Sequence, residues 1–109
     1  MNRVDALEEI VTFGLHRNEA FLELVNYPFD SELELIKINN KILITVLRKY
    51  NSNLISSNEL EEWANFIECR DDINYEEVEG YIYALANPEL MGEVCPKSIS
   101  KMLKILSTS

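Results

Sequence analysis

Residues 56–67 read SSNELEEWANFI, and this stretch combines a helix start signal with a helical pattern of apolar residues. Ser56 and Glu59 have the spacing of a capping box, in which the two side chains satisfy free N–H groups at the start of a helix. The residues that follow have two faces at helical spacing. The apolar face holds Leu60, Trp63, Ala64 and Ile67, and the opposite face holds Glu61, Glu62, Asn65 and Glu68. We therefore predict an amphipathic helix, with Trp63 in the core rather than in an interface.

The sequence after this helix predicts two more. A polar connector that contains Arg70, Asp71, Asp72 and Asn74 follows, and apolar residues then return at helical spacing before Asn87-Pro88, a pair that ends helices. The inward residues of this helix are Val78, Tyr81, Ile82 and Leu85. Pro96 suits the first position of a last helix, because proline needs no N–H partner there. Its inward residues are Ile99, Met102, Leu103 and Leu106, with Lys97, Lys101 and Lys104 outward.

The N-terminal part of the chain predicts an interrupted helix. Residues 3–16 carry Val4, Leu7, Ile10 and Val11 at helical spacing. Gly14 and the polar residues after it weaken the pattern before Phe21 resumes it, so we expect a kink or a short break there. Pro28 ends the second piece, because the residue before a proline is pushed out of the helical region.

The segment between Pro28 and Tyr50 predicts a central helix. Asp30 or Ser31 can cap its start, and Glu32 and Glu34 fall in the first turn, where the helix dipole favours negative charge. Apolar residues from Leu33 to Leu47 cover more than one stripe, as a helix with several neighbours requires. The β-branched run 42–46 also fits a strand. The length and the caps favour a helix, so the prediction is one all-α domain, residues 1–109, with five or six helices.

Size and charge limit the possible functions. The chain has 109 residues, of which 47% are hydrophobic, enough for one core. Its net charge of −9 disfavours nucleic acid or an anionic membrane as a direct partner and favours a basic protein. We find no export signal and no uncharged run long enough for a membrane span, and we expect a cytoplasmic protein. Cys69 and Cys95 lack CxxC spacing and are expected to be reduced thiols.

The residues predict no enzyme and no cofactor. His16 is the only histidine and has no nucleophile motif or second metal ligand near it. The three glycines are too far apart for a phosphate loop. Asp72-x-Asn74-x-Glu76 resembles the start of a calcium loop, but Glu77 stands where that loop needs glycine. We therefore predict neither a catalytic nor a metal site.

Acidic residues are concentrated in one segment. Between Ser57 and Gly80 there are nine acids against the single Arg70, which gives −8 of the total −9. A solvated face is the simple explanation. However, like charges close together on a helix reduce stability, which favours a surface that a partner uses. The predicted partner-binding residues are Glu61, Glu62, Glu68, Asp71, Asp72, Glu76 and Glu77, with Tyr75 as a partly apolar anchor.

Three stretches resemble a known group of bacterial proteins. They are Tyr27-Pro28-Phe29-Asp30-Ser31, Glu59-Leu60-Glu61-Glu62-Trp63-Ala64-Asn65 and Arg70-Asp71-Asp72-Ile73. Together they are similar to immunity proteins of contact-dependent growth inhibition systems, which are polymorphic toxin systems. The resemblance implies a cytoplasmic protein that binds the C-terminal toxin domain of a cognate effector, often a nuclease, and blocks it.

Electrostatics is compatible with that expectation. A nuclease binds a polyanion and so presents a basic cleft, which a strongly acidic helical surface can occupy in competition with nucleic acid. One alternative is an acidic helical adaptor or regulatory subunit that binds another basic protein. A third possibility is a small enzyme that uses carboxylates with a bound metal.

Overall fold

The helices predicted from the sequence are present in the computed structural model, which describes residues 1–28 and 32–107. Within these residues the chain forms seven α-helices, one 3-10 turn and two very short strands. The helices are α1 (Arg3–Val11), α2 (Arg17–Leu24), α3 (Asn40–Asn51), α4 (Ser57–Glu68), α5 (Glu79–Ala86), α6 (Pro88–Met91) and α7 (Pro96–Ser107). The prediction of one all-α domain is confirmed. The count exceeds five or six because the chain makes a separate short turn of helix, α6, directly after α5.

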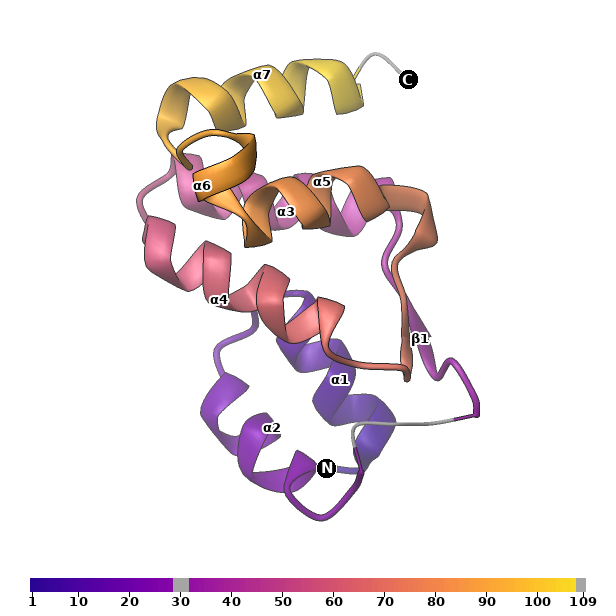
Figure 1. Cartoon of the computed structure of the whole chain (residues 1–109). Helices are drawn as coiled ribbons and strands as arrows, with labels where there is room; N and C mark the ends of the chain where they lie inside the picture. Colours follow the sequence, from indigo (N-terminus) through magenta and orange to yellow (C-terminus); the bar gives the residue numbers. More distant parts are fainter. Residues whose placement is uncertain (29–31, 108–109) are drawn as a thin grey trace.

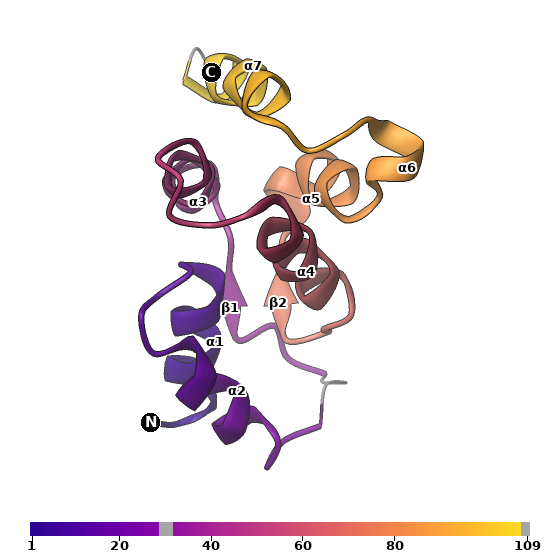
Figure 2. The ribbon, with the colours of Figure 1, turned by 90° about the vertical axis from the view of Figure 1, so that its left-hand side faces the viewer.

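The helices are arranged in pairs along the molecule. Helix α1 packs against α2, α4 against α5, and α3 against α7. Figure 1 shows the α1–α2 pair at the bottom and α7 at the top, with α3, α4 and α5 between them. The view turned by 90° shows α7 lying on the α3 side, away from the short strands (Figure 2). The molecule is therefore elongated, with the α1–α2 pair at one end and α7 at the other.

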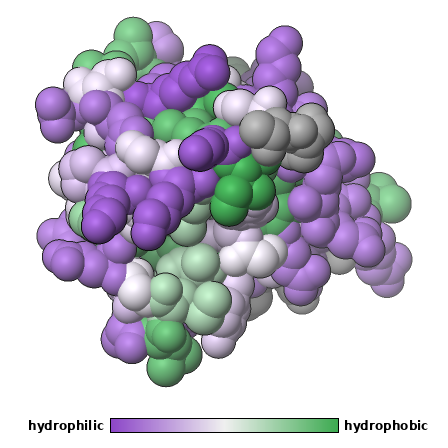
Figure 3. All heavy atoms as spheres, turned by 90° about the horizontal axis from the view of Figure 1, so that it is seen from above, coloured by the Kyte–Doolittle hydropathy of each residue, from purple (hydrophilic) through white to green (hydrophobic). Residues whose placement is uncertain are grey.

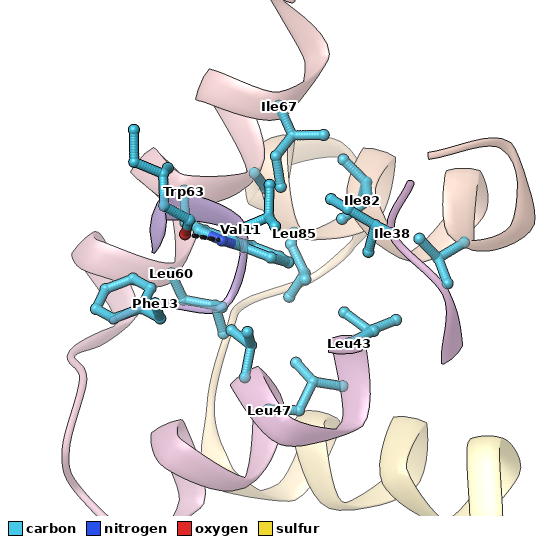
Figure 4. Close-up of a cluster of buried hydrophobic side chains, with 14 of the residues drawn as sticks. Val11, Phe13, Ile38, Leu43, Leu47, Leu60, Trp63, Ile67, Ile82 and Leu85 are labelled. Carbon is cyan, nitrogen blue, oxygen red and sulfur yellow. Dashed lines mark hydrogen bonds between the residues drawn. The ribbon is translucent and has the colours of Figure 1, made fainter. Parts of the chain in front are cut away.

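Helix α4 has the capping box and the buried face that the sequence predicts. The Ser56 hydroxyl accepts a hydrogen bond from the Glu59 N–H at 3.1 Å, and the Glu59 carboxylate accepts one from the Ser56 N–H at 3.0 Å. Trp63 is buried, and its Nε1–H donates to the Ile10 carbonyl at 3.1 Å. Figure 4 shows this bond within a cluster of apolar side chains from α1, α3, α4 and α5. Trp63 is thus a core residue, as predicted.

The expected break around Gly14 is present. Helix α1 ends at Val11 and α2 begins at Arg17, with Phe13 in the left-handed region at φ 55°. Lys49 of α3 caps the end of α1, because its Nζ donates to the carbonyls of Thr12 and Phe13, each at 3.0 Å. A cation at this position satisfies carbonyls that have no partner inside the helix. A contact with a distant helix therefore stabilises the break that the sequence around Gly14 predicts.

The prediction of a helix through residues 33–38 is wrong. The chain there is extended, and β1 (Ile36–Lys37) pairs in parallel with β2 (Ile73–Asn74). Ile38 lies fully buried just after β1, and its N–H donates to the Asn74 carbonyl at 2.8 Å. Residue alternation along 36–38 suits this conformation, since Lys37 faces solvent between two inward isoleucines. The predicted cap at Asp30 or Ser31 lies outside the described residues.

Helix α3 instead begins at Asn40. The Asn39 side chain accepts a hydrogen bond from the Ile42 N–H at 2.9 Å, so Asn39 is the N-cap. The Glu77 carboxylate, which lies in the 3-10 turn η1 (Glu76–Val78), accepts the Asn40 N–H at 2.7 Å. The β-branched run 42–46 is helical, as expected. The N-cap of this helix is therefore Asn39, about eight residues later in the chain than the sequence predicts.

The connector before β2 carries a buried ion cluster. Asp72 has no exposed surface, and its carboxylate binds Arg70 through two hydrogen bonds of 2.9 and 2.7 Å. Arg3 of α1 donates to the same carboxylate at 3.1 Å and to the Pro28 carbonyl at 2.9 Å. The Asp72 carbonyl accepts the N–H groups of Leu35 and Ile36. Asp72 therefore joins α1, the end of α2, β1 and the connector.

Replacement of Asp72 should destabilise the protein strongly. In Asp72→Asn, Arg70 stays buried without its counter-charge, and loss of one partner of a buried pair costs about 3 kcal/mol or more. Urea unfolding followed by circular dichroism measures this loss. The matched control is Asp71→Asn, because Asp71 is the adjacent, exposed carboxylate and should change the free energy of unfolding by no more than about 0.5 kcal/mol. Equal effects of the two variants would contradict the role given to Asp72.

Two glycines should respond oppositely to alanine. A Cβ at Gly80, near the start of α5, would meet no atom within 4 Å, whereas Gly92 has φ +107°, which L residues rarely adopt. Gly80→Ala should stabilise the protein by about 0.5 kcal/mol, since alanine is the better helix former. Gly92→Ala should destabilise it by about 1 kcal/mol because of strain. Thermal unfolding of both variants checks the signs, and destabilisation by Gly80→Ala would contradict this placement.

Candidate functional site: an acidic patch around Tyr75

The structure divides the eight predicted partner-binding residues among several places. Four of them lie together near the end of α4 and the start of β2, namely Glu68, Asp71, Tyr75 and Glu76. Glu61 and Glu62 lie on two sides of α4. Asp72 and Glu77 are engaged inside the protein. The acidic segment is therefore not one continuous surface.

Asp72 is not available to a partner, so its assignment to the binding surface is wrong. Burial by itself would raise the pKa of its carboxyl group. The hydrogen bonds and positive charge of Arg70, and then those of Arg3, outweigh burial and hold the pKa below the ordinary value of 3.8. The carboxylate is thus charged and fully used within the fold. The sequence signal that points to this is the proximity of Arg70, the only basic residue in the acidic segment.

Glu77 also has a structural role. Besides the Asn40 N–H, its carboxylate lies 3.7 Å from the Lys37 Nζ. An anion at the start of α3 is favoured by the helix dipole, and the lysine partly balances its charge. Glu77 is still largely exposed, but its charge is directed to α3 and not to the patch around Tyr75.

The residues around Tyr75 form a candidate recognition surface, which we call the Tyr75 patch. It consists of Glu34, Glu68, Asp71, Tyr75, Glu76 and Glu79. Glu34, Tyr75, Glu76 and Glu79 border a hollow of about 220 Å³, whose floor includes Ile73. The Asn74 side chain orders its rim, because it accepts the Glu76 N–H at 3.0 Å and donates to Glu34 at 3.4 Å. Five carboxylates thus surround one half-buried tyrosine.

Tyr75 responds to these neighbours. Partial burial raises the pKa of its phenol, and surrounding groups that carry negative charge raise it further. The carboxylates that do so are, in decreasing order, Glu68, Glu79 and Asp71. The phenol therefore keeps its proton at neutral pH and can donate a hydrogen bond from within a negatively charged surface. The ring supplies apolar area at the same place.

Two members of the patch are missing from the sequence-based set. Glu79 is one of the nine acids of the segment, and its place at the start of α5 aims it toward Tyr75. Glu34 lies about forty residues earlier in the chain and arrives through the pairing of β1 with β2. Helical spacing could have suggested Glu79, but no local signal could have found Glu34.

Glu61 and Glu62 face different sides of α4. Glu61 and Glu68 are seven residues apart and share a face, so Glu61 extends the surface toward the start of α4. Glu62 instead borders a hollow of about 190 Å³ between α4 and the turn that joins α1 to α2. Phe13, Phe21 and Trp63 line this second hollow. We call it, with the exposed side of α2, the α2–α4 groove.

Basic residues collect at the other end of the molecule. Helices α3 and α7 pack together, and neither contains an acidic residue. Their exposed cations are Lys41, Arg48, Lys97, Lys101 and Lys104. Figure 3 looks onto the α7 end and shows hydrophilic side chains on either side of a central apolar strip. The chain therefore carries a basic surface on α3 and α7 in addition to the acidic Tyr75 patch, a separation that composition alone does not reveal.

The structure also places the single histidine and the two cysteines. His16 is an exposed residue at the start of α2, and both cysteines are free thiols. No three His, Cys, Asp or Glu side chains within residues 1–28 and 32–107 are placed to hold a metal ion. No helix in the same part of the chain is long and apolar enough to cross a membrane.

Comparison with known proteins adds no relative, since no protein-family model, no curated protein and no solved structure matches this chain. The geometry of the Tyr75 patch and the charge distribution are therefore the main support for a function.

The pKa of Asp72 predicts a specific acid sensitivity. A carboxylate whose pKa is lower in the folded protein stabilises the fold fully above the pKa of the unfolded chain, here the ordinary 3.8, and loses this contribution as the pH falls below it. The difference in free energy of unfolding between wild type and Asp72→Asn should therefore be largest at about pH 6 and shrink at about pH 2.5. Urea titrations at both values measure it. A difference that does not depend on pH would contradict the assignment.

Proposed function

We propose that this chain binds and neutralises a cognate toxin domain, of the nuclease class, by presenting the Tyr75 patch to its basic cleft. The observation that carries the proposal is the convergence of five carboxylates around one half-buried tyrosine on the surface of the protein. A cluster of this kind costs stability through mutual repulsion unless a partner compensates it. A cationic cleft provides that compensation.

The chemistry of the patch suits competition with nucleic acid. Nucleases bind the phosphate backbone with Lys and Arg side chains, and carboxylates make comparable charge-assisted hydrogen bonds with the same groups. Tyr75 adds a protonated donor and an aromatic ring, a residue type enriched at protein interfaces. Asp71 and Glu76 lie at the exposed rim, where charges chiefly affect the rate of association.

The basic surface on α3 and α7 favours one orientation of the encounter. A cationic partner is attracted to the Tyr75 patch and repelled by the exposed lysines of α3 and α7. Such a charge separation aligns the protein before contact and increases the association rate at low ionic strength. It also supports the choice of a protein partner whose own surface is strongly basic.

The resemblance to immunity proteins supports a toxin as that partner. An adaptor that binds an unrelated basic protein would use the same surface, and gene order separates the two alternatives. An immunity gene lies directly downstream of its toxin gene. Co-purification with the C-terminal domain of the product encoded immediately upstream, and rescue of cells that express this domain, would support the proposal. Selective binding of a basic protein that is not a toxin would favour the adaptor.

Charge reversal in the patch should slow association. In the triple variant Glu68→Lys, Asp71→Lys and Glu79→Lys, the association rate with the upstream-encoded domain should fall by about tenfold or more at low salt, and less at high salt. Stopped-flow or surface-based kinetics at two salt concentrations measures this, and circular dichroism checks the fold.

The matched control makes the same net change elsewhere. Glu8→Lys, Glu89→Lys and Glu93→Lys alter exposed acids on α1, on α6 and before α7. If this control slowed association as much as the patch variant, net charge alone would govern binding and the patch would have no special role. An unchanged rate in the patch variant would place the interface elsewhere.

A further inference from the structure

The outer side of α2 exposes apolar side chains that the core does not need. Only Ala20 and Leu24 of this helix are buried, whereas Leu22 and Val25 are 72% and 80% exposed. Phe21 is partly exposed on the same side, and Leu15 in the preceding turn is almost fully exposed. Residues three and four apart on a helix are neighbours, so Phe21, Leu22 and Val25 form one apolar stripe. Contiguous exposed apolar surface of this kind marks an interaction site.

The stripe borders the hollow of the α2–α4 groove. Phe21 belongs to both, because it lines the hollow and packs edge-on against Phe66 with ring centroids 5.3 Å apart. The hollow measures about 190 Å³, and Phe13 and Trp63 form its apolar walls. A space of about 150 Å³ is sufficient for a benzene-sized group. The hollow can therefore accept one large apolar side chain, with the stripe covering the residues beside it.

The charges around the groove select its occupant. Glu59 and Glu62 border the hollow, and Glu19 and Glu23 of α2 lie along the other edge of the apolar stripe, beside Leu22. The one arginine at the hollow, Arg17, is already engaged. Its guanidinium lies over the Phe13 ring at 3.8 Å, donates to the Gly14 carbonyl at 2.8 Å and is 3.7 Å from Glu59. The rim is thus negative, and it complements a segment with Lys or Arg beside its apolar residues.

A second copy of this chain complements the groove poorly. A symmetric contact would place the same glutamates of two α2 helices against each other. The basic helix α7 of a second copy exposes one large apolar side chain, Ile105, because Ile99 and Leu106 are buried in its own protomer; one such side chain could enter the hollow but would leave the α2 stripe uncovered.

We propose that the α2–α4 groove docks a basic amphipathic helix of a protein partner, with one apolar side chain in the hollow and cationic side chains over the glutamate rim. The inference rests on the proposed function in that the partner is the same basic protein. The Tyr75 patch attracts this partner, and the groove supplies the desolvated apolar contact that slows its dissociation.

The experiment uses a synthetic helical peptide of about 18 residues built from Leu and Lys, with the leucines on one face. Trp63 is the only tryptophan and lines the hollow, so its fluorescence reports occupation directly. The Leu–Lys peptide should bind and change this fluorescence. A peptide with Gln in place of Leu, and one with Glu in place of Lys, should each bind at least about tenfold more weakly.

Variants locate the binding. Leu22→Gln with Val25→Gln should raise the Kd of the Leu–Lys peptide about tenfold. The matched control Leu54→Gln with Leu90→Gln changes two equally exposed leucines outside the groove and should leave the Kd within about twofold. Equal effects of the two double variants, or equal binding of the Gln peptide, would overturn the proposal. If the wild-type protein sedimented as a dimer and Leu22→Gln with Val25→Gln made it monomeric, the groove would bind a second copy of the chain instead.

The same variants separate this inference from the proposed function. If the upstream-encoded domain bound tightly and Leu22→Gln with Val25→Gln left its affinity unchanged, the inference about the groove alone would be refuted. Binding of the Leu–Lys peptide in the groove, without any binding of that domain, would refute the proposed function alone.

Discussion

The buried carboxylate of Asp72 is the interaction on which the arrangement of this protein depends. Its two arginine partners come from the connector and from α1, and Arg3 is sixty-nine positions away in the chain. The backbone of the same residue accepts the first hydrogen bonds of the β1 segment. An unpaired charge at this depth would be very unfavourable, so α1 and the β1–β2 pair must assemble around it together. This requirement fixes one end of the molecule.

The recognition surface is a consequence of the same connector. Since Asp72 and Ile73 turn inward, Asp71 stays at the surface, and the chain that continues from Ile73 brings Tyr75 and Glu76 beside the end of α4. Parallel pairing with β1 then adds Glu34. The acids of one chain segment thus have three different roles. Asp72 holds the fold, Glu59 and Glu77 stabilise the starts of α4 and α3, and the others remain on the surface as negative charge.

The groove depends on the way in which the first helix ends. Lys49 binds the terminal carbonyls of α1, and Phe13 adopts a left-handed conformation in the turn that follows. The turn brings Arg17 over the Phe13 ring and leads into α2, of which only Ala20 and Leu24 are buried. A helix with so little buried area leaves its remaining apolar residues at the surface. These residues and the acidic patch lie on different sides of α4, which gives the protein two surfaces with different chemistry.

The sequence by itself determined the features that are encoded locally. The capping box at Ser56, the apolar face around Trp63, the break near Gly14 and the start of α7 at Pro96 each depend on residues within a few positions of one another. The tertiary structure alone decided the extended segment 36–38, the burial of Asp72, the use of Glu77 at α3 and the membership of Glu34 in the patch. Each of these depends on a partner more than thirty positions away, as for Glu77 and Asn40. Periodicity describes which side of a helix is apolar, but it contains no information on which distant charge or backbone group meets a given side chain. For that reason the acidic segment could be identified from the sequence, whereas its division into structural and surface carboxylates could not.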